Sequence, residues 1–169
     1  MGVMNESPES ALEAFKQGFR RHAAGVAVVT SLAPDGRPVG FTATSLASLA
    51  ADPPLASFNM ARISTAWPAM TVGNIVAIHT LGPRNRDLAS LMAGDHDVRF
   101  VGDHWSAGPH GVPIIKDVTS WMLGPVVEIL PVAENAVVVV RIEEGQLGDD
   151  DEALLYHERT YMKPSGLDN

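Results

Sequence analysis

The sequence feature that most constrains the fold is a series of short apolar runs rich in β-branched residues. Such runs cover residues 26–32, 75–81 and 137–144, and glycine, proline and aspartate separate them. Short runs of this composition indicate buried strands, because β-branched side chains pack well on a pleated sheet. We therefore expect a mainly β protein with a few short helices, a barrel or sandwich and not a parallel doubly wound sheet.

The turn at residues 34–37 contains Pro34, Asp35 and Gly36, so it joins the first run to a returning strand in a hairpin. The remaining strands are expected at residues 38–45, 55–60 and 120–130, with a closing hairpin at 154–156 and 160–162.

A first helix is expected from an N-cap at Ser7 to a stop at Gly25. Its apolar stripe consists of Leu12, Phe15 and Phe19. The stripe fits a packing helix with a solvated basic end or a helix that binds a partner. Short helices are also expected at 64–72, with Ser64 as N-cap, and at 86–92, and a polar loop at 93–113.

The length and composition predict one globular domain over residues 1–169, with residues 1–8 as a disordered tail. The absence of cysteine excludes disulfides, thiolate catalysis and cysteine-ligated metals. A net charge of -8 argues against nucleic acid and anionic membranes as partners. No apolar run is long enough for a transmembrane helix and no signal peptide is visible, so we expect a cytoplasmic protein.

A loop rich in histidine and aspartate is the one place where a metal site can be considered. Its candidate ligands are Asp95, His96, Asp97, Asp103, His104 and His110. Imidazole and carboxylate suit several divalent ions, but the spacing matches no metal motif. We therefore expect a solvated polar loop and no metal.

Two hydroxyl-rich segments, residues 40–48 and 62–65, form the candidate ligand site. Small side chains let a flat ligand approach the backbone, while hydroxyls and an arginine at a helix start can hold a phosphate. Ordinary turn chemistry explains the same residues equally well. No dinucleotide-binding glycine fingerprint, P-loop or nucleophile elbow is present.

Several motifs occur in the order found in one known family. They lie at residues 19–30, 40–45, 52–55, 64–68 and 111–115, at Trp121, and at 154–157 with Tyr161. In this order they resemble the flavin reductase-like, FMN-binding split-barrel family, which includes reductase components of two-component flavin-dependent monooxygenases. The resemblance covers nearly the whole chain.

The resemblance implies a homodimeric split β-barrel that binds FMN, or FAD, near the subunit interface. The flavin contacts implied by matching positions are Thr42, Ala43, Thr44 and Ser45, then Met60, Ala61, Arg62, Ser64 and Thr65 on the phosphate side, then His79, Thr80 and Leu81 along the ring edge, with Phe100 approaching from the long loop. The implied reaction is hydride transfer from NADH or NADPH to flavin N5, supplying reduced flavin to a partner monooxygenase. This chemistry requires no side-chain acid or base, so no catalytic residue is named.

Two positions depart from the family pattern. Asn135 stands where the family has a histidine associated with the nicotinamide, which makes Asn135 the nicotinamide-facing candidate. His79 stands where the family commonly has asparagine, and it fits a flavin contact or a core histidine. The first departure keeps an alternative open, namely a split barrel that binds a flavin or another flat cofactor without turning it over.

Overall fold

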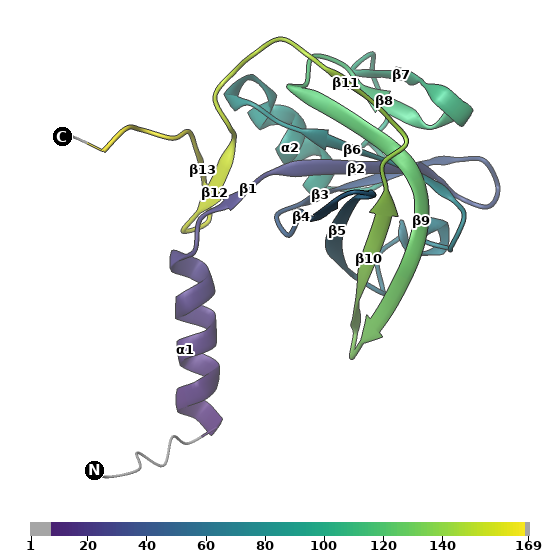
Figure 1. Cartoon of the computed structure of the whole chain (residues 1–169). Coiled ribbons are helices and arrows are strands. Elements are labelled where there is room, and N and C mark those ends of the chain that lie inside the picture. The colour runs from purple at the N-terminus through teal and green to yellow at the C-terminus, as the bar shows by residue number, and fades with distance from the viewer. Residues whose placement is uncertain (1–7, 168–169) are drawn as a thin grey trace.

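The computed structural model of the protein describes residues 8–167, in which antiparallel strands outnumber helices (Figure 1). The main strands are β2 Ala27–Leu32, β3 Pro38–Ala43, β4 Ala47–Ala51, β5 Pro54–Ala61, β6 Ile75–Thr80, β9 Ser120–Val132 and β10 Asn135–Arg141. They form one sheet in the order β3-β2-β6-β9-β10-β5-β4.

Smaller elements surround this sheet. The short strands are β1 Ala24–Gly25, β7 Trp105–Ala107, β8 Pro113–Ile115, β11 Glu144–Leu147, β12 Leu155–His157 and β13 Thr160–Met162. The α-helices are α1 Pro8–Arg21 and α2 Arg86–Ala93, and 3-10 turns occupy Trp67–Ala69, Pro83–Asn85 and Pro109–Gly111. β1, β12 and β13 form a three-stranded sheet, β7 pairs with β8, and β11 pairs with β9.

The long strand β9 curls the sheet into a split barrel. Its residues 120–125 pair with β6, and residues 126–132 pair with β10, where the register shifts between Val139 and Val140. A bulge of this kind bends a strand and increases its twist. The sheet ends, β3 and β4, are not hydrogen-bonded to each other within the described residues, so the barrel stays open. The expected mainly β, split-barrel fold is confirmed.

Both faces of strand β2 are buried, which explains its continuous apolar sequence. Val29 belongs to the cluster inside the curl, together with Phe58 and Ile78. Val28 points to the other face and packs with Met92 of α2 and Ile115 of β8. The sheet is therefore packed on both faces at β2, the strand that pairs with β3.

Helix α1 stands away from the sheet (Figure 1). Its C-terminal end is attached to the β12–β13 hairpin, where the Glu158 N–H donates to the Arg20 carbonyl (3.1 Å) and His157 Nε2 donates to the Arg21 carbonyl (3.0 Å). Its apolar stripe remains open to solvent, with Leu12 53%, Phe15 62% and Phe19 62% exposed. The apolar stripe of α1 therefore does not pack against the sheet, which argues against the first of the two interpretations given above.

Two predicted helices are shorter than expected. α1 ends at Arg21 because Ala24 and Gly25 already pair with β12, and the expected N-cap Ser7 lies outside the described residues. Residues 64–72 form only the 3-10 turn Trp67–Ala69, in which Pro68 lacks the N–H that a longer helix would use. The expected tail at residues 1–8 also falls outside the described part, except for Pro8, which begins α1.

The predicted polar loop at 93–113 is partly ordered as strand, since β7 lies in it and pairs with β8. Strands β4 and β11 were not predicted. Among residues 8–167, no helix combines the length and the hydropathy that crossing a bilayer requires.

Candidate functional site

The end of strand β3 and the facing end of β5 enclose a hollow of about 300 Å³. The predicted site residues that line it are Thr42, Ala43, Thr44, Ser45, Met60, Ala61 and Ser64. Phe41, Asn59 and Arg99 complete the lining. The structure therefore brings together the two segments that the sequence identified separately.

Local hydrogen bonds fix this strand end and leave part of its hydroxyl chemistry available. The Thr42 hydroxyl donates to the Ala89 carbonyl of α2 (2.7 Å), and Ser45 Oγ accepts the Asn59 N–H (2.8 Å). These bonds tie β3 to α2 and to β5. Thr44 is exposed, and no hydrogen bond of its hydroxyl is recorded within residues 8–167. It is free to face a ligand.

A second hollow of about 380 Å³ adjoins the first. Two predicted residues, Thr65 and Phe100, line it, together with Arg37, Gly40 and Trp105 among others. The two hollows are neighbours because Gly40 precedes Phe41, Thr65 follows Ser64, and Arg99 lines both. Phe100 and Trp105 meet edge to face in it, with ring centroids 5.5 Å apart.

Arg99, at the junction of the hollows, is a candidate residue that the sequence reasoning missed. Its Nη1 donates to the Gly40 carbonyl (2.7 Å), and its Nε and Nη2 donate to the Gly94 carbonyl (3.2 and 2.7 Å). Burial lowers the pKa of Arg99, with Asp95 opposing that shift, and a guanidinium remains cationic in proteins. No ion pair to Arg99 is recorded in the described chain. A held cation with no carboxylate within ion-pair distance suits an anionic ligand.

Arg62, the arginine that the sequence favoured, lines neither hollow. Its guanidinium lies over the Trp67 ring at 5.9 Å, and Nη1 donates to the Ala133 carbonyl (3.3 Å). Asn135 is close by at the start of β10, where it is exposed and pairs with Ala61 of β5. Asn135 itself lines neither hollow, but its strand partner Ala61 lines the first.

Of the two roles considered for His79, a flavin contact or a core histidine, the structure supports the core histidine. It is fully buried, Nδ1 donates to the Val28 carbonyl (2.9 Å), and Nε2 accepts the Ile115 N–H (3.0 Å). Burial lowers its pKa to about 4, so it is neutral near pH 7. With both nitrogens occupied, His79 has no donor or acceptor left for a ligand.

Thr80 and Leu81 also lie away from both hollows. Thr80 Oγ1 bonds to the hydroxyls of Thr119 (2.7 Å) and Ser120 (2.5 Å), and Leu81 is buried beneath α2. The predicted ring-edge contacts of residues 79–81 are therefore not part of the site that the geometry assembles.

The polar loop holds one group with metal-ligand chemistry. The ligand atoms of Asp95, His96 and Asp97 lie within 4.8 Å of one another, and all three residues are exposed. His104 is not among them, since its Nε2 donates to the Arg99 carbonyl (2.7 Å). His96 and Asp97 of this group also line the second hollow, and the group contains no buried metal ligand.

The chain is similar to known flavin reductases over most of its length. The family model for the flavin reductase like domain matches residues 19–165. The NADH:FMN oxidoreductase of Rhodococcus qingshengii is 37% identical over 158 residues, covering 90% of this chain and 82% of that protein. A flavin reductase domain protein from Arthrobacter sp. FB24 has a crystal structure with a TM-score of 0.88 at 49% identity, covering 94% of this chain and 98% of that one.

A third relative belongs to an oxygenase system. The reductase component of the flavin-dependent trigonelline monooxygenase of Acinetobacter baylyi is 28% identical over 128 residues, covering 76% of this chain and 41% of that protein. From the matched family model, these relatives and the split barrel, it follows that this chain belongs to the flavin reductase-like family.

Proposed function

We propose that the chain is an NAD(P)H-dependent flavin reductase that binds FMN, and also FAD, in the hollow between the ends of β3 and β5. The observation that carries the proposal is Arg99, a half-buried cation with no carboxylate within ion-pair distance in the described chain, held where the hydroxyl-lined first hollow meets the second. The NADH:FMN oxidoreductase relative supports the same activity.

The residues present fit a flavin. Ser64 and Thr65 flank Arg99 at the junction and offer hydroxyls for a phosphate. Thr42, Ala43, Thr44 and Ser45 form a small-residue wall on which a flat ring can lie, opposite Met60 and Ala61. We place the flavin phosphate at Arg99 and not at Arg62, because Arg62 lines neither hollow.

When bound, flavin supplies an N5 position that accepts a hydride from a reduced nicotinamide. The task of the chain is to hold the flavin and to leave one face open for the nicotinamide. His79 is neutral and has both nitrogens occupied, so it is not a proton donor here. Asn135, exposed beside Ala61, is the residue that we assign to the nicotinamide.

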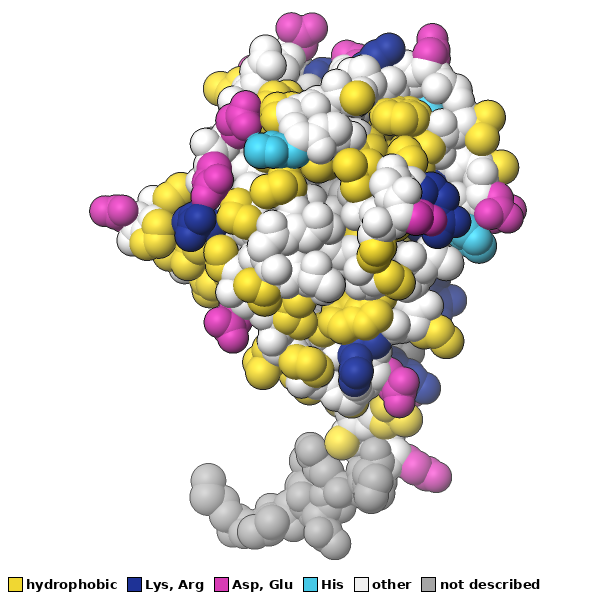
Figure 2. All heavy atoms as spheres, turned by 90° about the vertical axis from the view of Figure 1, so that its right-hand side faces the viewer, with side chains coloured by type: hydrophobic (Ala, Val, Ile, Leu, Met, Phe, Trp, Pro, Cys, Tyr) yellow, Lys and Arg dark blue, Asp and Glu magenta, His cyan; other side chains and the backbone are white. Residues whose placement is uncertain are grey.

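We further propose that the chain acts as a homodimeric single domain and supplies reduced flavin to a monooxygenase. The uncovered stripe on α1 supports a second copy as partner, since α1 is fixed at one end and projects outward. Figure 2 shows hydrophobic side chains spread over another face, with the cations scattered among them. The monooxygenase partner is supported by the Acinetobacter baylyi relative.

Asn135 also favours a second candidate function, a split barrel that binds flavin without reducing it. Asparagine donates a hydrogen bond but does not titrate or stack as imidazole does. Oxidation of NADH and NADPH, measured with free FMN, FAD or riboflavin, distinguishes the two. The reductase account predicts flavin-dependent oxidation of at least one nucleotide. Tight FMN binding without any oxidation would instead identify the non-catalytic binder.

A further inference from the structure

We propose that the apolar stripe of helix α1 from one copy of the chain docks in a groove beside strand β4 of a second copy. The stripe consists of Leu12, Phe15 and Phe19. The inference rests on the proposed homodimer, and it goes further because it places the contact on named elements of both copies. Two-fold symmetry repeats the contact, so each α1 covers the groove of the other copy.

The β4 groove has a volume of about 480 Å³ and lies at one end of the main sheet. Its lining is apolar apart from Ser48. Leu46, Met122 and Ile142 in this lining are partly buried and also pack on the core cluster inside the curl. The alanines of β4 and the first residues of β5 complete the lining. The groove is therefore a preformed apolar surface that belongs to the barrel itself.

The position of the groove at an edge strand is the first argument for a helix as its occupant. β4 ends the sheet, and most of its residues are exposed. An edge strand presents unpaired backbone groups, and proteins commonly cover such an edge with a helix or a loop. In the described chain, no residue of α1 or α2 lines the β4 groove. A helix from a second copy fits this place.

The second argument is that α1 has an apolar face which its own chain leaves exposed. Phe15 and Phe19 are each 62% exposed, and their rings lie 4.8 Å apart. The C-terminal end of α1 is tied to the β12–β13 hairpin, where the Glu158 N–H donates to the Arg20 carbonyl (3.1 Å). From this attachment the helix points away from the sheet (Figure 1). The stripe therefore faces a second copy and not the groove of its own chain.

The third argument is the charge on the helix beside the stripe. Lys16, Arg20 and Arg21 form a basic flank on α1. Within residues 8–167, no ion pair is recorded for any of these three cations. The flank is therefore available to carboxylates on a second copy.

The groove is bordered by acidic residues. Asp52 directly follows the β4 part of the lining, and Glu143 and Glu144 follow Ile142. Arg141 pairs with Glu143 (2.6 Å), whereas no ion pair of Asp52 or Glu144 is recorded in the described chain. An apolar groove with an acidic border thus matches an apolar stripe with a basic flank.

Disulfide trapping tests the contact, because the chain has no cysteine of its own. Leu12→Cys keeps both phenylalanines and is combined in turn with Ala47→Cys or Ala51→Cys in the groove lining. Under mild oxidation, at least one double variant should form a disulfide between copies, seen as a covalent dimer of roughly twice 18.0 kDa. Leu12→Cys with Leu130→Cys is the matched control and should not cross-link, since Leu130 is exposed but lies outside the groove.

A charge placed in the groove gives a second, independent measurement. Ala51→Lys puts a cation where the stripe and its basic flank arrive, so it should raise the dissociation constant of the dimer by at least about tenfold. Ala107→Lys, at an exposed position of β7 outside the groove, should leave the constant unchanged. Analytical ultracentrifugation measures both variants.

The remaining outcomes separate this contact from the proposals on which it rests. A wild-type dimer in which neither groove variant cross-links, or in which Ala51→Lys has no effect, overturns the inference and leaves the homodimer standing. Efficient cross-linking of Leu12→Cys alone also overturns it, because the two stripes would then pack on each other. A wild-type monomer refutes the homodimer together with the contact. FMN binding and NADH oxidation by the same samples report on the flavin reductase function separately.

Discussion

At the residue scale, the most constrained polar side chain is His79. Its ring joins β2 to β8, because one nitrogen donates to Val28 and the other accepts from Ile115. Only the neutral ring can make both bonds at once, since the protonated ring has no acceptor. The fold therefore depends on keeping this histidine uncharged.

We expect His79 to make stability depend on pH. Its pKa is about 4 in the folded protein and 6.5 in an ordinary environment, so its stabilising effect is complete above 6.5 and is lost as the pH falls toward 4. The full loss amounts to about 3 kcal/mol. Urea unfolding of wild type and His79→Gln, at neutral and acidic pH, measures it. The variant should lose less stability on acidification, and equal losses would contradict this role.

Asn135 carries the second residue-scale prediction. If it faces the nicotinamide, Asn135→His should lower the KM for NADH or NADPH, or raise the rate of flavin reduction, by about fivefold. FMN affinity should stay the same. Glu134→His, one residue away in the same turn, is the matched control and should change neither value. Stopped-flow reduction of bound flavin is the measurement, and unchanged kinetics in Asn135→His would remove the assignment.

Most of the predicted small and hydroxyl residues line a common hollow, whereas the predicted arginine lines neither hollow. Residues 42–45, with Met60, Ala61 and Ser64, are brought together because strand ends β3 and β5 meet, and their composition already indicated a ligand wall. The choice between Arg62 and Arg99 depends on side-chain direction. Trp67 and the Ala133 carbonyl hold one arginine away, while Gly40 and Gly94 hold the other at the junction. No local pattern encodes these long-range contacts.

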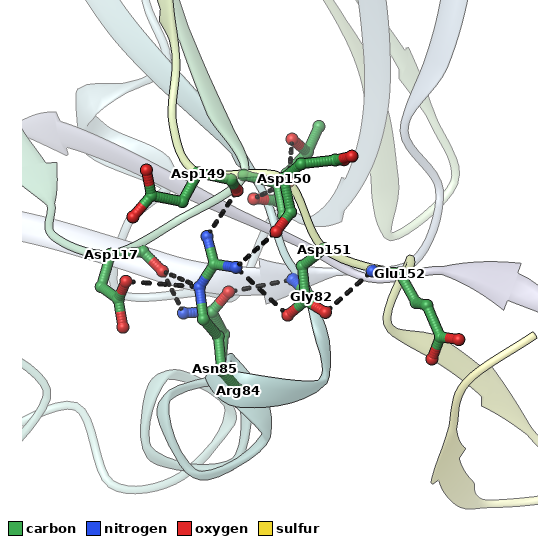
Figure 3. Close-up of polar contacts among 10 residues, drawn as sticks. Gly82, Arg84, Asn85, Asp117, Asp149, Asp150, Asp151 and Glu152 are labelled. Carbon is green, nitrogen blue, oxygen red and sulfur yellow. Dashed lines mark hydrogen bonds and ion pairs between the residues drawn. The ribbon is translucent and has the colours of Figure 1, made fainter.

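At the element scale, Arg84 ties the segment before β12 to the rest of the fold (Figure 3). Its side chain donates to the backbone carbonyls of Asp117, Asp149 and Asp150, and pairs with the carboxylates of Asp151 (3.2 Å) and Asp117 (3.3 Å). The carboxylates of Asp149 and Asp150 point away from it (Figure 3). Residues 149–151, which form an acidic segment before β12, are thus held mainly through their backbone.

Arg84→Met should destabilise the protein by about 2 kcal/mol, because a mostly buried charged donor to three backbone carbonyls is lost. The Arg84 side chain is only 24% exposed, so water replaces those bonds poorly. Arg141→Met removes the exposed pair with Glu143 and should cost less than about 0.5 kcal/mol. Thermal unfolding of the two variants gives the comparison. Equal effects would show that Arg84 acts as an ordinary surface charge.

The elements that the sequence predicted well carry strong local signals. The β2–β3 hairpin has a turn in which Gly36 adopts a φ of 83°, and Asp35 Oδ1 accepts the Arg37 N–H (3.0 Å). β4 was missed because its alanine-rich and largely exposed sequence lacks the β-branched signal. Pairing with β5 makes it a strand. β7 was missed because its three residues become a strand only through β8.

At the scale of the whole molecule, the uncovered stripe on α1 predicts association. The rings of Phe15 and Phe19 lie 4.8 Å apart, tilted by 50°, and both side chains are 62% exposed. In the proposed homodimer, the basic residues Lys16, Arg20 and Arg21 of this helix would be opposite in charge to the carboxylates of Asp149 and Asp150 of a second copy.

Light scattering should therefore report a mass of roughly twice 18.0 kDa. The double substitution Phe15→Ser with Phe19→Ser should weaken the dimer by at least about tenfold, because two aromatic anchors are lost. Gln17→Ser, on the opposite side of α1, should leave the mass unchanged. A wild-type monomer at the same concentration would contradict the proposed dimer.

The central claim is that two hollows meeting at Arg99 hold the flavin by its phosphate. Titrating FMN and riboflavin into wild type, Arg99→Gln and Arg62→Gln tests it most directly, because riboflavin lacks the phosphate. The account predicts that Arg99→Gln weakens FMN by about tenfold to a hundredfold and riboflavin hardly at all, while Arg62→Gln leaves both nearly unchanged. Equal weakening of FMN and riboflavin by Arg99→Gln, or selective weakening of FMN by Arg62→Gln alone, would contradict it.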